Sequence, residues 1–199
     1  EGNDKAMLRY GTMLLNGEGI QKDVTKAIEY YKSAADQGHV QSMFTYATMH
    51  FYGIGMNVNK KVAANYFKKA ADEEHFQSTK MYCEMLLNGI GVMINKKEAV
   101  KYLMKLVNVD DVDSLVKYAS LLQNGDIIKC DKTKAVKYYE KAAEKGSHQA
   151  MFNLALIYSN GNGVLFDRKK AIDYLFKAID HGNPEAREIL NKANLITGS

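Results

Sequence analysis

The chain has 199 residues, of which 46% are apolar and 25% are charged, with one proline, no tryptophan and a net charge of +4 at pH 7. These proportions are typical of a folded, helix-rich protein, and the charge falls short of the clustered basicity of a dedicated nucleic-acid binder. Two cysteines are too few for a disulfide framework, and no apolar run approaches the roughly 20 residues needed to span a bilayer.

A 36-residue pattern recurs along the chain. Its first copy, from Ala6 to Gly38, reads AMLRYGTMLLNGEGIQKDVTKAIEYYKSAADQG, and Gly17, Ala27 and Tyr30 each return four times at this spacing. Self-similarity at such a period indicates a stacked-repeat protein, in which each repeat buries its apolar face against its neighbours. We therefore expect a single array over residues 1–199. The expected repeats are 4–38, 39–74, 75–110, 111–146 and 147–182, followed by a closing helix at 183–196.

Each repeat holds two segments of helical period, joined by a loop such as Asn16-Gly17-Glu18-Gly19. Glycine and asparagine tolerate the positive φ that ends a helix, so this loop separates a first helix from a second. The expected helices are 4–16, 24–37, 40–52, 60–73, 76–88, 96–107, 112–124, 132–145, 148–160, 168–181 and 184–195. Side chains suited to cap the second helices recur in one register: Asp23, Asn59, Asn95, Asp131 and Asp167.

These residues carry a resemblance to a known family. The string Ala-x(4)-Gly-x(5)-Gly-x-Gly, followed by Lys26-Ala27-x-x-Tyr30-Tyr31-x-x-Ala34-Ala35-x-x-Gly38, resembles the Sel-one-like repeat, a 36-residue relative of the tetratricopeptide repeat. The resemblance covers essentially the whole chain. It implies an all-α fold, a right-handed αα-superhelix of five helix pairs plus a C-terminal helix, that acts as an adaptor in protein complexes.

The repeats depart from the family pattern in three places. Leu106-Val107 replaces a pair of alanines, Asp126-Ile127 stands where the second loop glycine belongs, and Glu74 replaces a turn glycine. Larger residues at a tight helix crossing would force the helices apart, so we expect the superhelix to bend or loosen around residues 105–130.

Catalytic motifs are weak in this sequence. Ser114-Leu115-Val116-Lys117 matches a Ser-x-x-Lys nucleophile motif, but its companion motifs Ser-Asp-Asn and Lys-Thr-Gly are absent. Ser114 also shares the register of Ser42 and Ser78, where a small packing residue is expected. Gly17-x-Gly19 follows a helix rather than a strand, so it is a helix-ending loop and not a phosphate site. We expect no enzyme activity and no cofactor.

The histidines do not form a metal-binding pattern, because no His-x-x-x-His pair occurs among the five. His39 and His75 are repeat-equivalent turn residues. His50 takes the register of Leu14 and Leu86, which indicates a packed side chain. We expect no metal site.

The expected binding site lies on the first helices. By analogy with tetratricopeptide grooves, positions on these helices should line the concave surface, where exposed apolar side chains mark an interaction site. The alternative is that the same side chains pack against neighbouring helices of a tightly wound superhelix, or are covered by further repeats. The candidate groove residues are Leu8, Thr12, Leu15, Phe44, Thr48, Phe51, Tyr52, Lys80, Glu84, Gln123, Phe152 and Leu156.

The lysines concentrate on the second helices and the loops before them, for example at Lys60-Lys61 and Lys68-Lys69. Since these helices should form the convex side, a solvated charged face is the expected interpretation. A reader of single-stranded RNA would instead carry its contacts on the first helices, so nucleic acid is not the expected partner.

The sequence thus predicts a non-enzymatic scaffold that binds a peptide or protein segment in its concave groove. The alternative is a self-associating repeat segment of a larger multidomain protein whose activity lies elsewhere, with continuation into further repeats. The chain has neither an initiator methionine nor a signal-peptide pattern at Glu1, so we expect a fragment of a longer, cytoplasmic protein.

Overall fold

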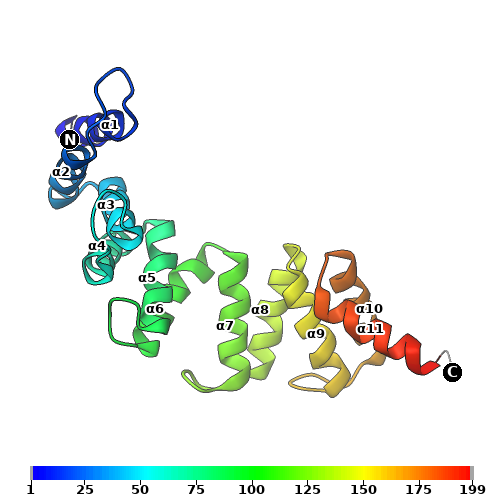
Figure 1. Ribbon diagram of the computed structural model, residues 1–199. Helices are drawn as coiled ribbons and strands as arrows, with labels where there is room; N and C mark the ends of the chain where they lie inside the picture. Colours follow the sequence, from blue (N-terminus) through cyan, green and yellow to red (C-terminus); the bar gives the residue numbers. More distant parts are fainter. Residues whose placement is uncertain (1, 198–199) are drawn as a thin grey trace. The chain divides into compact units, whose positions relative to one another are not determined.

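The computed structural model describes the backbone of residues 2–197 and the side chains of residues 4–191. Within this part the chain forms eleven α-helices and no strand (Figure 1). The predicted helices are confirmed, with ends that agree to within two residues. None of these helices is long and apolar enough to cross a membrane. The helices are α1 (Gly2–Asn16), α2 (Val24–Asp36), α3 (Val40–Tyr52), α4 (Lys60–Asp72), α5 (Phe76–Asn88), α6 (Lys96–Asn108), α7 (Val112–Asn124), α8 (Lys132–Glu144), α9 (His148–Asn160), α10 (Arg168–Asp180) and α11 (Pro184–Thr197).

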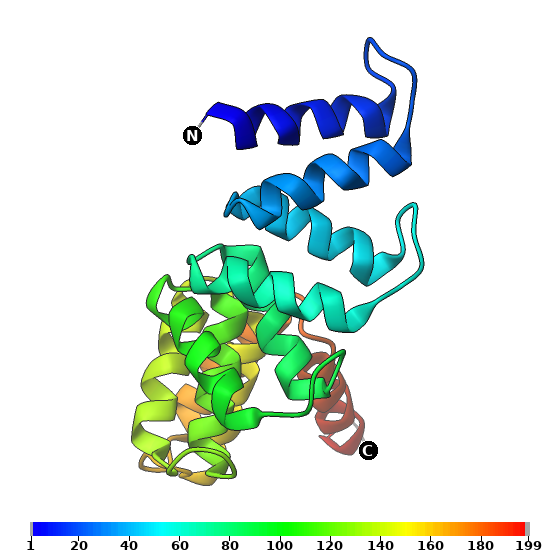
Figure 2. The same cartoon turned by 90° about the vertical axis from the view of Figure 1, so that its left-hand side faces the viewer.

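The chain divides into two compact units, Glu1–Lys105 and Leu106–Ser199. In the N-terminal unit each helix from α1 to α4 packs on the one that follows it, and Figure 2 shows these four helices as successive layers. In the C-terminal unit α7 to α11 follow the same order of packing. Each unit is therefore a stack of helix hairpins, in which odd-numbered helices are the first and even-numbered helices the second of a repeat.

The second helices begin at the predicted caps. Asp23, for example, accepts a hydrogen bond at Oδ1 from the backbone N–H of Lys26, 2.9 Å away. Each such bond satisfies one of the four N–H groups that a helix start leaves without a partner. The equivalent acceptors are Asn59, Asn95, Asp131 and Asp167.

The first helices use a second capping register, which includes two histidines. Nδ1 of His75 accepts from the backbone N–H of Ser78 at 3.3 Å, and His39 does the same for Ser42 at 3.2 Å. Asp111, Ser147 and Asn183 take this role in later repeats. An imidazole nitrogen accepts only when it carries no proton, so these two caps require neutral histidine.

Edge-on tyrosine pairs join the two helices of a repeat. Tyr46 and Tyr66 have ring centroids 4.8 Å apart and planes at 84°, and Tyr82 and Tyr102 repeat this arrangement at 4.9 Å and 87°. Such T-shaped pairs are worth about 0.5–1.5 kcal/mol beyond the area they bury. The regularity of these pairs explains why the tyrosines recur in sequence at the repeat spacing.

Neighbouring repeats meet where the second loop glycine approaches the preceding second helix. A Cβ at Gly91 would lie 2.2 Å from the backbone oxygen of Lys60, and one at Gly55 would lie 2.2 Å from Cγ1 of Val24. In the C-terminal unit a Cβ at Gly163 would lie 2.5 Å from Cβ of Lys132. Only glycine permits an approach this close, which explains the second glycine of the loop motif.

Candidate functional site

The predicted groove residues lie on α1, α3 and α5 in the N-terminal unit and on α7 and α9 in the C-terminal unit. We call the surface that these helices form in each unit the first-helix face of that unit. Its side chains differ widely in exposure. Tyr52, Glu84 and Leu156 are exposed, Phe152 is buried, and the remaining ones are half-buried: Leu8, Thr12, Leu15, Phe44, Thr48, Phe51, Lys80 and Gln123.

The aromatic side chains of α3 form a cluster around the fully buried ring of Phe67 on α4. The ring centroids of Phe44 and Phe51 lie 5.9 and 6.1 Å from that of Phe67. Phe44 also packs against the imidazole of His75, 4.9 Å away. Part of each ring therefore belongs to the packing between helices, which is the alternative that the sequence left open for these positions.

Tyr52 is the open member of this cluster. It is 63% exposed, and its ring stands edge-on to Phe51 with centroids 4.9 Å apart. Tyrosine supplies a large rigid contact area with a polar tip, which is why it is enriched at interfaces. An aromatic ring held by one neighbour and open on its other side is suited to contact an apolar side chain of a ligand.

Lys60 completes the cluster and was not among the predicted site residues. Its Nζ lies 3.4 Å from the centroid of Phe51 and 5.8 Å from that of Tyr52, and it donates a hydrogen bond to the backbone oxygen of Phe51. The ammonium thereby interacts with the ring faces and with the last turn of α3, where carbonyls lack helical partners. Its position at the start of α4, directly after the loop, was the available signal in the sequence.

On α1, Leu8 and Thr12 line a shallow depression of about 450 Å³ that also includes Lys5, Arg9 and Glu18. The hydroxyl of Thr12 donates to the carbonyl of Leu8, and that of Thr48 donates likewise to Phe44. Because their protons are already used within the helix, these threonines offer a ligand no donor. Oγ1 of Thr12 also accepts a hydrogen bond from the hydroxyl of Tyr31, 3.1 Å away.

In the N-terminal unit the first-helix face is polar at α5. Lys80 is half-buried on α5, with its Nζ 5.3 Å from the centroid of Phe76, and Glu84 is exposed one turn later. The two residues put one charge of each sign on the first-helix face at α5.

In the C-terminal unit the three predicted residues differ in exposure and in hydrogen bonding. Gln123 accepts a hydrogen bond at Oε1 from the hydroxyl of Tyr139, 3.2 Å away. Leu156 is 40% exposed. Phe152 is only 9% exposed, so its ring packs within the hairpin stack and does not form the open anchor that the sequence suggested.

The motifs considered for catalysis have structural partners. Ser114 is buried, and its hydroxyl donates to Oδ2 of Asp111 at 2.6 Å, as part of the cap of α7. His39 and His75 cap helices, and His50 packs edge-on against Tyr46. Among the side chains of residues 4–191, no group of three or more metal-binding residues gathers at one place.

Comparisons with known proteins agree with this geometry. The family model described as Sel1 repeat matches residues 4–39, 40–75, 79–105, 112–147 and 148–183. The crystal structure of a Sel1 repeat protein from Oxalobacter formigenes has a TM-score of 0.81 and 27% identity, with 94% of this chain and 77% of that chain covered. The structure of c5321, a protective antigen of uropathogenic Escherichia coli strains displaying an SLR fold, has a TM-score of 0.84 and 26% identity.

That second match covers 100% of this chain but 43% of the antigen, so this chain spans less than half of the antigen's length. Among curated proteins, none matches this chain significantly. The two structural matches confirm the predicted fold class, an all-α repeat array of the αα-superhelix type.

Proposed function

Because this chain belongs to the Sel1 repeat family, whose members generally mediate protein–protein interactions and are typically non-enzymatic, we propose that it is an adaptor that binds a peptide or protein segment along its first-helix face. The observation that carries the proposal is Tyr52, an exposed aromatic ring beside Phe51 and the ammonium of Lys60. Aromatic anchors of this kind dominate the affinity of many protein interfaces.

The chemistry of the face indicates an extended segment that presents both apolar and polar groups. Tyr52 and Leu156 offer apolar contact area in separate units of the chain. Lys80, Glu84 and the amide of Gln123 offer polar groups nearby on the same face of each unit. A ligand that spans several repeats gains affinity from each contact, which suits an adaptor better than an enzyme.

The test begins with the selection of peptides of about twelve residues from a random library against the full chain. Fluorescence anisotropy then measures binding of a selected peptide to Tyr52→Ala, Leu156→Ala and Glu84→Ala. We expect Tyr52→Ala to weaken binding by about 1–3 kcal/mol, the range of an aromatic anchor, without a change in helicity. Arg168→Ala, an exposed substitution on α10, is the control. Selected peptides whose affinity none of the three first-helix variants changes would end the proposal.

Self-association is the second candidate function, and one observation favours it. Ile172 on α10 is 44% exposed, whereas Val136, at the same register one repeat earlier, is 4% exposed. An apolar position that the fourth repeat buries is therefore open on the last second helix. Sedimentation velocity across a hundredfold range of concentration tests this candidate, with Ile172→Lys as the variant. A monomer at every concentration excludes it.

A further inference from the structure

Positions on the outer side of α1 are open, although later repeats bury their counterparts. In the N-terminal unit α1 is an outer layer with α2 on its inner side (Figure 2). Ala6 is exposed, whereas Ser78, at the same register on α5, is fully buried. Tyr10 is 42% exposed, whereas Tyr82, at its register on α5, is 5% exposed. Something that covers α5 is therefore missing over α1.

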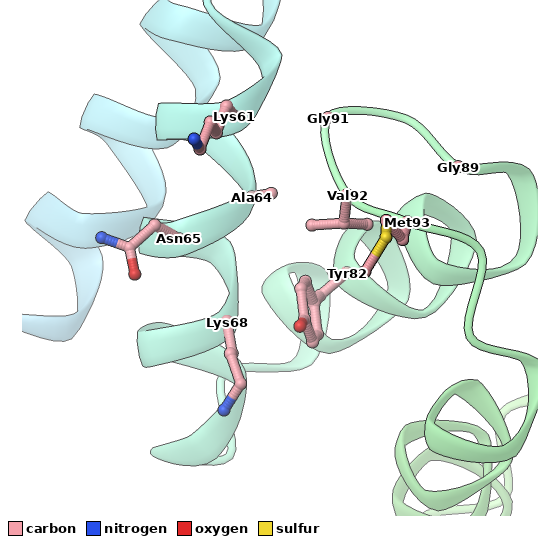
Figure 3. Close-up of a pocket in the computed structure, with 9 residues that line it drawn as sticks. All are labelled: Lys61, Ala64, Asn65, Lys68, Tyr82, Gly89, Gly91, Val92 and Met93. Atoms are coloured by element: carbon pink, nitrogen blue, oxygen red, sulfur yellow. The ribbon is translucent and has the colours of Figure 1, made fainter.

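The interface between α4 and α5 shows what covers these positions. The second helix α4 packs on α5, the first helix of the next repeat. Figure 3 shows the ring of Tyr82 beside α4, close to Lys68. Ala64 of α4 is buried at this interface. A second helix that precedes α5 is thus the element for which α1 has no counterpart.

The loop of the first repeat lacks the same contact. In the third repeat Gly91 lies against α4, where a Cβ would come within 2.2 Å of the backbone oxygen of Lys60 (Figure 3). Gly19 holds this place in the first repeat, and no atom lies within 4 Å of the position of its Cβ. The space that the start of a second helix fills in the later repeat is therefore open beside Gly19.

A tyrosine hydroxyl of the first repeat also lacks its counterpart's partner. Tyr102 on α6 donates a hydrogen bond to Oδ1 of Asp72, the last residue of α4, across 2.7 Å. Tyr30 takes the register of Tyr102, and its ring stands edge-on to Tyr10 with centroids 4.9 Å apart. Its hydroxyl has no hydrogen bond among the described residues, so it is free to donate to a carboxylate from outside the chain.

These residues surround one depression of about 490 Å³, which we call the α1 end face. Its lining residues are Ala6, Met7, Arg9, Tyr10, Met13 and Tyr30. The lining is mostly apolar, and its two unbranched methionines can adapt to the shape of a partner. Arg9 is exposed and has no ion pair among the described residues. A guanidinium beside a free hydroxyl favours a carboxylate, because both groups donate hydrogen bonds.

From this correspondence we infer that the α1 end face docks a helix of a partner protein that has the pattern of a Sel1 second helix and ends in an aspartate. The helix lies across Ala6 and Tyr10, as α4 lies on α5. Its first turn meets Gly19, and its aspartate accepts from the hydroxyl of Tyr30 and pairs with Arg9. The inference does not depend on the segment proposed for the first-helix face.

The probe is a synthetic peptide of residues 23–38 of this chain, which contains the sequence of α2 with its own N-cap and Asp36. A helix this short is marginal in water, so the peptide folds as it binds and affinities are compared between variants. The full chain carries ¹³C-labelled alanine and methionine methyl groups. We expect the peptide to shift the resonances of Ala6, Met7 and Met13. Asp36→Asn in the peptide should weaken binding about tenfold, the effect of a lost bond to a charged acceptor.

Two substitutions in the chain test the two contacts. Ala6→Gln puts a longer side chain at a register that later repeats fill with serine or alanine, and should weaken binding about tenfold. Lys5→Gln, an exposed neighbour outside the α1 end face, is the matched control and should change nothing. Tyr30→Phe should weaken binding as Asp36→Asn in the peptide does. The two changes together should cost little more than either one, because they remove the same bond.

Several results would overturn the inference. Wild-type affinity of Ala6→Gln is one, and losses from the Tyr30 and peptide Asp36 substitutions that simply add are another. Larger shifts at Ala47 of α3 than at Ala6 would show that the peptide replaces the chain's own α2.

Two further outcomes would assign the binding elsewhere and would also contradict the inference. Shifts that Tyr52→Ala abolishes would place the peptide on the first-helix face. A dimer of the chain alone in sedimentation velocity that Ala6→Gln dissociates would identify a second copy as the occupant. Failure of peptide selection on the first-helix face leaves the results expected for the α1 end face unchanged.

Discussion

The hydroxyl of Tyr66 on α4 donates a hydrogen bond to Oδ1 of Asp36, the last residue of α2, across 2.5 Å. One repeat later Tyr102 makes the same bond to Asp72, at 2.7 Å. Each bond joins the second helix of one repeat to the second helix of the next. These bonds therefore contribute to the coupling between repeats, on which the stability of a repeat array depends.

Removal of this hydroxyl should weaken the array. We expect Tyr66→Phe to lower the free energy of unfolding by about 1 kcal/mol, because a bond to a charged acceptor is lost while the acceptor remains accessible to water. Tyr30→Phe is the matched control, since Tyr30 holds the same register in the first repeat and its hydroxyl has no bond among the described residues. Urea denaturation of the three proteins at pH 7 makes the comparison. Equal losses in both variants would contradict the assignment.

The same pair predicts a response to acid. The bond from Tyr66 lowers the pKa of Asp36 below its ordinary value of 3.8, so the folded protein binds this proton less readily than the unfolded chain. The stabilisation is present above pH 3.8 and is lost as the pH falls through the lowered folded pKa. In Tyr66→Phe the free energy of unfolding should therefore fall less between pH 5 and pH 2 than it does in the wild type. Unfolding measured between pH 5 and pH 2 tests the difference.

His75 predicts a loss of stability nearer to neutrality. Burial lowers the pKa of His75 below its ordinary 6.5, and its Nδ1 must stay unprotonated to cap α5. Its stabilisation is therefore present above pH 6.5 and is lost as the pH falls through the lower folded pKa. His75→Asn supplies a cap without titration, as Asn183 does for α11. We expect a smaller change in stability between pH 8 and pH 5 in this variant than in the wild type. If stability depended on pH in His75→Asn as it does in the wild type, His75 would not be the titrating cap of α5.

His50 should be replaceable with a gain in stability. Both of its ring nitrogens are buried and lack a hydrogen-bond partner among the described residues, and its register holds Leu14, Leu86 and Leu122, all of them buried. A buried polar atom without a partner costs about 1–3 kcal/mol, so His50→Leu should raise the free energy of unfolding by a similar amount. The reciprocal Leu86→His should lower it. Thermal and urea unfolding at pH 8 measure both, and a loss on His50→Leu would show that the imidazole has a structural role.

Residues without the conformational freedom of glycine, Glu74 and Asp110, occupy two of the turns between repeats. Glu74 has φ of 62°, in the left-handed region, whereas the equivalent position one repeat earlier is Gly38 with φ of 95°. Since this conformation costs a side-chain-bearing residue about 1–2 kcal/mol, Glu74→Gly should stabilise the protein by up to about 1 kcal/mol after the greater entropy of glycine is counted. Gly38→Ala, where no atom lies within 4 Å of the new Cβ, should destabilise it by strain alone. The same sign for both changes would contradict this account.

The repeat period and the helix boundaries could be read from the sequence because they depend on local signals. The loop glycines and the cap at Asp23 act within a few residues, and each is repeated in every copy or nearly so. The capping histidines were missed as caps because histidine is not among the preferred capping residues. Their signal was nevertheless present, since His39 and His75 share a register with Asp111, Ser147 and Asn183.

Exposure could not be read in the same way, because it depends on residues far away in the sequence. Phe44 and Phe152 hold equivalent positions, yet one is half-buried against Phe67 and His75 and the other is fully packed.

The contact between Gly91 and the backbone of Lys60 affects which substitutions a repeat array tolerates. Main-chain atoms meet there, so substitution of the surrounding side chains leaves the joint intact. Exposed side chains beside the joint, such as Lys61 and Met93, can thus be exchanged for others at little energetic cost. A hairpin moved into another Sel1 array should therefore keep this joint and carry its own exposed side chains with it.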